Sequence, residues 1–245
     1  MDAETIREIR NMSYPAIFED NGETYIVLID GSVHPFICPA VTPETVTLHS
    51  LDALIKMVEN EAMELNHCGK IFIKTNSPTN VEAFTAPEAE QRDYRHKLYS
   101  VSATDIPGWE PMVSLGYEEA IVAIRTRFQP SDDTDYMLKL LSEISNGAKV
   151  TLNDNGIATT VVTQKGVALQ SGVAIRPIVS LRPYRSFQEL DQPEGQFLIR
   201  VSERAISFVE ADGGMWKLTA RQSIVEYLQS RLKGYIETGS VVVML

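Results

Sequence analysis

The amino-acid sequence predicts an α+β protein with a largely antiparallel sheet built from hairpins and three or four inserted helices. Two observations lead to this class. Turn dipeptides that supply residues with positive φ, such as Asp30-Gly31 and Asn155-Gly156, lie between apolar or alternating runs, as they do in hairpins. Helical spacing of apolar residues occurs in only a few separate segments, and no strand–helix alternation around a Gly-rich phosphate loop is present. The pattern therefore favours antiparallel pairing over a parallel α/β sheet.

Composition limits the class of protein. The 245 residues suffice for one large domain or two small ones. We expect an N-terminal helix plus β-meander over residues 1–44 and a main α+β domain over residues 45–245, unless the two form one continuous domain. The net charge of −11 repels a nucleic-acid backbone, which argues against a nucleic-acid partner. There is no run of 18 apolar residues and no apolar segment at the N-terminus, and only two cysteines occur. We therefore expect no membrane partner and a reduced compartment.

The first expected elements are a meander and a helix. Residues 15–37 predict three strands, and residues 75–93 predict an exposed loop or a helical turn because of their prolines and charges. Between them, Ser50 is a suitable N-cap and Gly69 a suitable stop for a helix. Its apolar residues recur at three- and four-residue spacing: Leu51, Leu54, Ile55, Val58, Ala62 and Leu65.

The remaining elements follow in order. The apolar residues within 117–128 fit the period of a helix as well as that of a strand. We favour a strand from residue 120 because β-branched residues dominate. A second helix is expected over residues 133–145 and a hairpin over residues 149–163. Residues 206–218 predict another hairpin that turns at Asp212-Gly213. Two final elements are a helix from Thr219, where Thr219 to Gln222 match a capping box, and an apolar strand over residues 241–245.

Motifs for catalysis or cofactor binding are missing from the sequence. It contains no nucleotide-binding glycine loop, no zinc-protease motif and no serine nucleophile elbow, so we expect no cofactor. The catalytic candidates are Glu210 and Asp212, because residues two apart on a strand share a face and two carboxylates can bind Mg²⁺. The favoured alternative is structural. Asp212 then caps its own turn, and Glu210 pairs with a basic residue such as Lys217.

The segment Arg182-Pro183-Tyr184-Arg185 allows three interpretations. Its two arginines form an anion clamp, pair internally with Glu189 or Asp191, or contact another chain together with Tyr184. Pro183 donates no ladder hydrogen bond, so the segment is expected at a sheet edge or a strand end.

Two terminal segments predict self-association. A helix near residues 3–12 has a narrow apolar stripe of Ile6, Ile9 and Met12 and is too short to be stable alone. The last strand, which contains Val241 and Val243, is apolar to its final residue. An unpaired apolar edge invites association, so each segment docks inside the fold or in a symmetric homo-oligomer.

Several segments of the sequence resemble the YfdQ-like family of bacteriophage and prophage proteins, whose biochemical function is unknown. They are Thr45 to Leu54, Leu181 to Glu189, Gln192 to Glu194, Phe197 to Arg200 and Glu210 to Lys217. The resemblance implies a phage-encoded protein in a bacterial cytoplasm. It assigns no catalytic residue.

Three functional hypotheses follow. The first is a non-enzymatic phage accessory protein that assembles with itself, with a host or phage protein as a further candidate partner. The second is a metal-dependent hydrolase or nuclease that uses Glu210 and Asp212. The third is an acidic decoy that occupies a host nucleic-acid-binding or defence protein, for which the motive is the net charge of −11.

Overall fold

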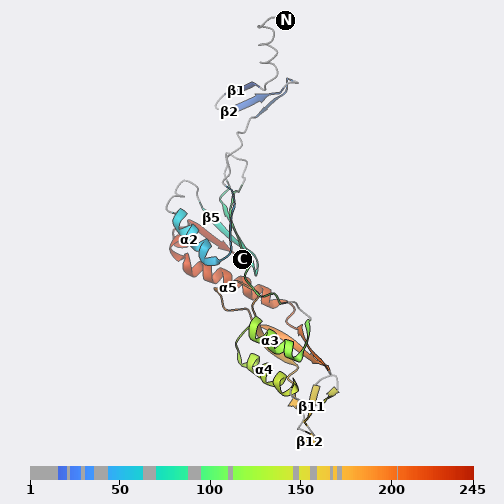
Figure 1. Cartoon of the computed structure of the whole chain (residues 1–245). Coiled ribbons are helices and arrows are strands. Elements are labelled where there is room, and N and C mark those ends of the chain that lie inside the picture. Colours follow the sequence, from blue (N-terminus) through green and yellow to red (C-terminus); the bar gives the residue numbers. More distant parts are fainter. Residues whose placement is uncertain are drawn as a thin grey trace. The chain divides into compact units, whose positions relative to one another are not determined.

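The computed structural model describes residues 16–20, 23–28, 31–35, 44–62, 70–87, 95–109, 113–145, 149–154, 159–165, 168–169, 173–202 and 204–245. Backbone contacts divide the chain into two units (Figure 1). The first comprises residues 1–43 and 87–95, and the second comprises residues 44–86 and 96–245. Each unit is described by itself below.

The first unit contains an antiparallel meander of β1 (Ala16–Asp20), β2 (Glu23–Val27) and β3 (Val33–Pro35). It confirms the strands expected within residues 15–37. At the second turn Gly31 has φ +80°, and its N–H donates to the carbonyl of Leu28. The helix expected near residues 3–12 lies outside the described residues.

The second unit has a five-stranded sheet in the order β17-β5-β6-β7-β4. The antiparallel strands β5 (Ile71–Ser77), β6 (Asn80–Thr85) and β7 (Lys97–Ser102) form its middle. At its two edges β17 (Val241–Met244) and β4 (Val46–Leu48) join in parallel. The loop or helical turn expected over residues 75–93 is therefore wrong for residues 75–77 and 80–85, which belong to β5 and β6. Pro78 suggested a loop, but it lies in the turn before β6, and the residues of β6 are alternately buried and half-buried.

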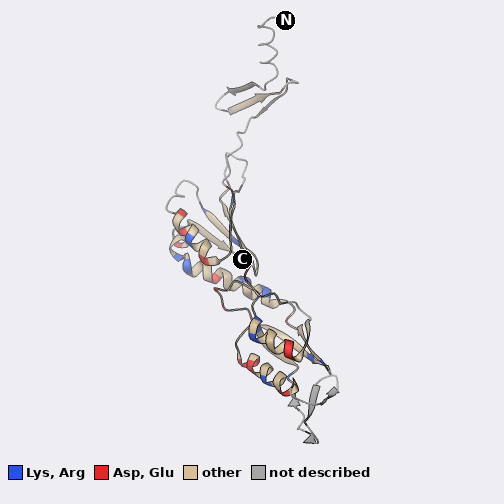
Figure 2. Ribbon diagram, in the orientation of Figure 1, with Lys and Arg blue, Asp and Glu red and all other residues tan. Residues whose placement is uncertain are grey.

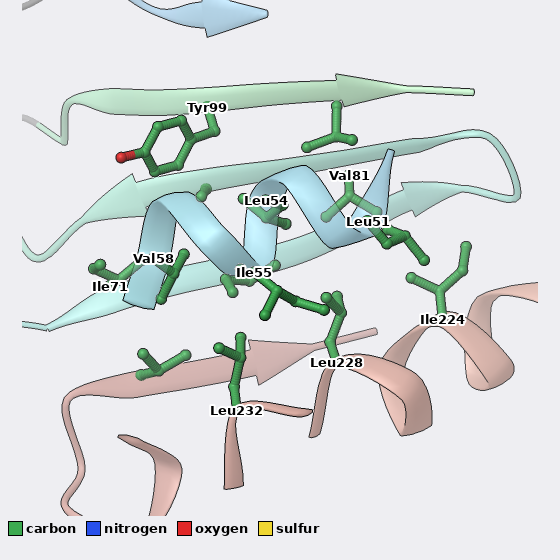
Figure 3. Packing of buried hydrophobic residues seen from close by; sticks show 14 of the residues in the cluster. Leu51, Leu54, Ile55, Val58, Ile71, Val81, Tyr99, Ile224, Leu228 and Leu232 are labelled. Carbon is green, nitrogen blue, oxygen red and sulfur yellow. The ribbon is translucent and has the colours of Figure 1, made fainter. Parts of the chain in front are cut away.

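Two helices cover one face of this sheet, α2 (Leu51–Ala62) and α5 (Met215–Arg231), and the short α6 (Lys233–Glu237) follows (Figure 3). The helix predicted from residue 51 is confirmed for residues 51–62. Leu54 of α2 and Leu228 of α5 are fully buried against Ile73 and Val81 of the sheet. We name this cluster the first core. Its residues alternate along the strands, as expected for a sheet with one covered face.

A second five-stranded sheet has the order β8-β16-β15-β14-β9 and is antiparallel throughout. Its strands are β8 (Val113–Gly116), β9 (Phe128–Gln129), β14 (Ile178–Pro183), β15 (Gly195–Val201) and β16 (Ala205–Glu210). Helices α3 (Tyr117–Arg127) and α4 (Asp132–Ser145) pack against it and form a second core with Phe197 and Phe208. The helix expected over residues 133–145 is thus confirmed.

The strand expected from residue 120 is wrong for residues 120–127, because they belong to α3, and only Phe128 at its end begins a strand, β9. Ala120, Ala123 and Ile124 are buried at helical spacing, which outweighs the strand preference of the β-branched residues. The helix also has two glutamates in its first turn and two arginines in its last, as its dipole favours. The side chain of Glu119 accepts a hydrogen bond from the Gly116 N–H at 3.1 Å.

The predicted hairpin over residues 206–218 is also wrong. Only its first arm is a strand, β16, and the second arm is the beginning of α5, which starts at Met215 rather than at Thr219. The Thr219 hydroxyl donates back to the carbonyl of Met215 from inside the helix, so it caps nothing.

A small sheet of β10 (Lys149–Asp154), β11 (Thr159–Lys165), β12 (Ala168–Leu169) and β13 (Val173–Ala174) completes the elements. Strands β10 and β11 confirm the hairpin expected over residues 149–163, and the α+β prediction is confirmed for the chain. No helix within the described residues is long and apolar enough to cross a membrane. Basic and acidic residues occur together on α2, α3, α4 and α5 (Figure 2).

Candidate functional site

The sequence motifs in the C-terminal third of the chain contribute residues that meet around one buried arginine, Arg185. The end of β14 leads into a turn that carries Arg185, and β16 ends at Glu210. Trp216 lies in the first turn of α5. These three residues come from separate segments, and their contacts form a cluster that we name the Arg185 cluster.

The Arg185 guanidinium is held by an ion pair and by aromatic rings. Its Nη1 donates to Glu210 Oε1 at 2.6 Å, and the two side chains are only 7% and 21% exposed. The guanidinium carbon lies 3.7 Å from the centre of the Trp216 ring and 5.8 Å from that of Phe197. Arg185 Nε, Arg185 Nη2 and Trp216 Nε1 make no hydrogen bond within the described part of the chain. Stacking and one ion pair therefore hold this charge.

Burial lowers the pKa of Arg185 to about 10, while Glu210 and then Asp212 act to raise it. The guanidinium therefore stays charged at neutral pH. It packs directly on the backbone of Gly195, where a Cβ atom would lie 2.4 Å from Arg185 Nη2 and 3.4 Å from Asp212 Oδ2. Only glycine leaves room for the arginine at this first residue of β15.

Asp212 has a structural position. Its Oδ1 accepts the Gly214 N–H at 2.9 Å, and Gly213 and Gly214 have φ of +62° and +81°. This turn leads from β16 into α5, and its hydrogen bond agrees with the expectation that Asp212 caps its own turn. The suggested partner Lys217 for Glu210 is wrong, because Lys217 lies in α5 and Glu210 binds Arg185.

The turn that carries Arg185 is held by Gln192. The Gln192 side-chain oxygen accepts the N–H groups of Arg185 and Ser186 at 3.0 and 3.1 Å, and its nitrogen donates to the Phe187 carbonyl at 3.0 Å. The turn also joins both cores of the second unit. Phe187 is buried in the first core, and the Ser186 hydroxyl donates to the Pro78 carbonyl at 2.8 Å, beside β5 and β6. The segment thus connects the two sheets.

Arg182 has a different environment, although it lies three residues before Arg185. It pairs with Glu194 at 3.3 Å, and the two side chains are 40% and 53% exposed. Neither arginine uses the expected partners Glu189 and Asp191. Pro183 ends β14 opposite Phe128 of β9, so it lies at a strand end, and β9 forms the edge of that sheet. The N–H of Tyr184 donates to the Arg127 carbonyl at 2.9 Å.

A cavity of about 340 Å³ opens at the N-terminus of α2, close to the same turn. Its lining includes His49, Asp52, Asp105, Phe187 and Glu189. Two of the carboxylates already have partners. Glu189 accepts the Leu51 N–H at 2.6 Å and so caps α2, and Asp52 accepts the Tyr227 hydroxyl at 2.7 Å. The pKa of Tyr227 is raised, mainly by this hydrogen bond to Asp52 and to a smaller extent by burial.

The other predicted contact residues fall elsewhere. Ile6, Ile9 and Met12 lie outside the described residues. Val241 is buried in the first core and Val243 packs against it, so both side chains serve the internal fold. Sequence reasoning missed the contacts of Gln192, Gly195 and Trp216 with Arg185, because no local spacing signals these contacts.

In the part of the chain that the structure describes, no three His, Cys, Asp or Glu side chains are grouped so that they could hold a metal ion. Chemically, the Arg185 cluster is suited to fixing the relative positions of β14, β16 and α5. No family model, no curated protein and no solved structure matches this chain.

Proposed function

We propose that the protein is a non-enzymatic phage or prophage accessory protein that works through protein contacts, including assembly with its own copies. The phage context rests on the sequence resemblance alone. The contact function rests on the meander β1-β2-β3. Wherever the burial of a side chain in this sheet is described, that side chain is half-buried or exposed, and Val33 is 53% exposed.

A three-stranded sheet needs a packed apolar face for stability. In this meander Val27 lies opposite Val33, and Tyr25 lies opposite Pro35. Because the two pairs are separated by two residues along each strand, their side chains share one face. That face carries only apolar residues and Tyr25 in these two pairs, whereas the opposite face carries Ile17, Ile26 and the polar His34. A matching face on a second copy would bury the exposed Val33 and Pro35, since two sheets commonly pack face to face.

Light scattering coupled to size-exclusion chromatography tests the proposal on the full chain. We expect an oligomer at micromolar concentration. Val33→Asp introduces a charge on the apolar face and should increase the dissociation constant at least tenfold. The matched control His34→Asp places the same charge on the opposite face and should change it little.

A wild-type chain that stays strictly monomeric across the micromolar range contradicts the self-assembly part of the proposal. Equal effects of the two substitutions would show that the apolar face of the meander is not the contact surface.

A further inference from the structure

The outer edge of β17 is an apolar strand edge. Strand β17 pairs with β5 on one side only, and no other strand within the described residues adjoins it. Its sequence, Val-Val-Val-Met, has no charge, proline or glycine. Proteins usually protect exposed edges with such residues or with bulges, because open strand edges pair with other chains. This edge lacks those residues.

The direction of the backbone groups follows from the pairing with β5. The Ile71 N–H donates to the Ser240 carbonyl at 2.9 Å, so Ser240 faces β5. Backbone groups of successive residues in a strand point to opposite sides, so Val242 also faces β5. The N–H and C=O groups of Val241 and Val243 therefore point to the open edge.

An apolar row on the face of the sheet opposite the first core ends at this edge. Val242 lies beside Phe72, and Phe72 lies beside Phe84 on the next strand. All three side chains are half-buried. The opposite face, with Val241, Ile71 and Ile73, is the one that contributes to the first core under α2 and α5 (Figure 3). The row Phe84-Phe72-Val242 thus stops at the strand edge without an apolar neighbour in the described sheet.

We propose that the β17 edge pairs antiparallel with β17 of a second copy about a twofold axis, and so joins two five-stranded sheets into one. In this register Val241 of each copy pairs with Val243 of the other, and both pairs exchange their two N–H···O bonds. Val242 then lies opposite Val242 of the second copy. The apolar row continues across the axis into an identical row, which is why a second copy fits this edge.

This inference rests on the proposed function, because it names one interface through which the protein assembles. It involves the second unit, whereas the meander belongs to the first, so the two surfaces are tested separately. The contact strand is uncharged, but each copy has a net charge of −11. Salt screens the repulsion between two such copies, so higher salt should tighten this association.

The test uses charge complementation at Val242 in the full chain. Val242→Lys and Val242→Glu each place like charges directly opposite at the twofold axis, which destabilises a sheet pair. Each variant alone should dimerise at least tenfold more weakly than the wild type in light scattering. An equimolar mixture of the two should recover a dimer of one copy of each. Ser114→Lys on the exposed edge strand β8 is the matched control and should leave the association unchanged.

A second measurement does not depend on a charged substitution. Residues opposite each other in a non-hydrogen-bonded antiparallel pair have Cα atoms about 4.5 Å apart, within the range for a disulfide. Val242→Cys should therefore form a cross-linked dimer on mild oxidation, and Ser114→Cys and the wild type should not.

The outcomes separate the two proposals. If the wild type assembles but Val242→Lys assembles equally well and Val242→Cys does not cross-link, the β17 interface is wrong and the proposed function stands. If the wild type is monomeric at every concentration and salt level, the β17 interface and the self-assembly part of the proposed function both fail.

Discussion

Arg182 and Arg185 lie three residues apart and form ion pairs of very different kinds. The Arg182–Glu194 pair is 3.3 Å long at the end of β14, with side chains that are 40% and 53% exposed. The Arg185–Glu210 pair is 2.6 Å long in the interior, with side chains that are 7% and 21% exposed. Solvent competes with the first pair, whereas the second is surrounded by Trp216, Phe197 and the backbone of Gly195.

The comparison shows that burial, more than the identity of the charged groups, decides what an ion pair contributes. Exposed pairs typically stabilise by less than about 1 kcal/mol. A buried pair adds little net stability relative to an apolar replacement, but removal of one partner leaves an unpaired buried charge. We therefore expect the interior pair to be sensitive to substitution and the surface pair to be insensitive.

Arg185→Ala should have the largest effect. It leaves the Glu210 carboxylate without its partner and empties the space beside Trp216. We expect a loss of about 3–5 kcal/mol in the free energy of unfolding, measured by urea denaturation. A loss below about 1 kcal/mol would mean that the buried Arg185–Glu210 pair is no more sensitive to substitution than the exposed Arg182–Glu194 pair, which would contradict the difference inferred between them.

Gly195→Ala should follow, because its new methyl group would lie 2.4 Å from Arg185 Nη2. Since stacking and the ion pair hold the guanidinium, we expect a loss of about 1–3 kcal/mol. In an Arg185→Ala background the methyl group has room, so the two losses should not add. Additive losses in the double-mutant cycle would show that the crowding involves another group.

Asp212→Ala removes the side-chain acceptor of the Gly214 N–H and should lower the free energy of unfolding by about 1 kcal/mol. Asp212→Asn keeps an acceptor oxygen and should lose less. Equal losses for the two variants, measured by the same denaturation, would indicate that the charge of Asp212 near Arg185 matters more than the cap.

Arg182→Ala should have the smallest effect, below about 1 kcal/mol, because its pair with Glu194 is exposed. The effect should shrink further at high salt. A double-mutant cycle with Glu194→Ala measures the pair directly, and a coupling as large as that of Arg185 with Glu210 would contradict the proposed difference.

The sequence predicted those elements whose periodicity is strong. The apolar stripes of α2 and α4 and the turn dipeptides of the hairpins suffice for this, because local spacing follows directly from the geometry of helices and strands. Three expectations were wrong for identifiable reasons. Pro78 suggested a loop where it only forms the turn before β6. In α3 the β-branched residues conceal a helix that tertiary packing favours, and at Asp212 a turn into a helix has the same dipeptide as a hairpin.

The candidate site was only partly predictable. The sequence indicated that Asp212 caps a turn and that Glu210 has a basic partner, since both depend on local chemistry. It did not indicate Arg185 as that partner, nor the stacking of Trp216, because these contacts depend on how β14, β16 and α5 are arranged. The role of Gly195 likewise becomes evident only from the guanidinium that packs on it.

The parallel pairing of β17 with β5 has a consequence for folding during translation. The second core draws its buried residues from residues 120–208, so it can close while later residues are still being added. The first core cannot, because it includes Ile224, Leu228, Leu232 and Val241. Strands β5, β6 and β7 are synthesised before the second sheet. A ribosome-bound chain that has not yet reached residue 215 nevertheless lacks α5 and β17, which complete the sheet that these strands form.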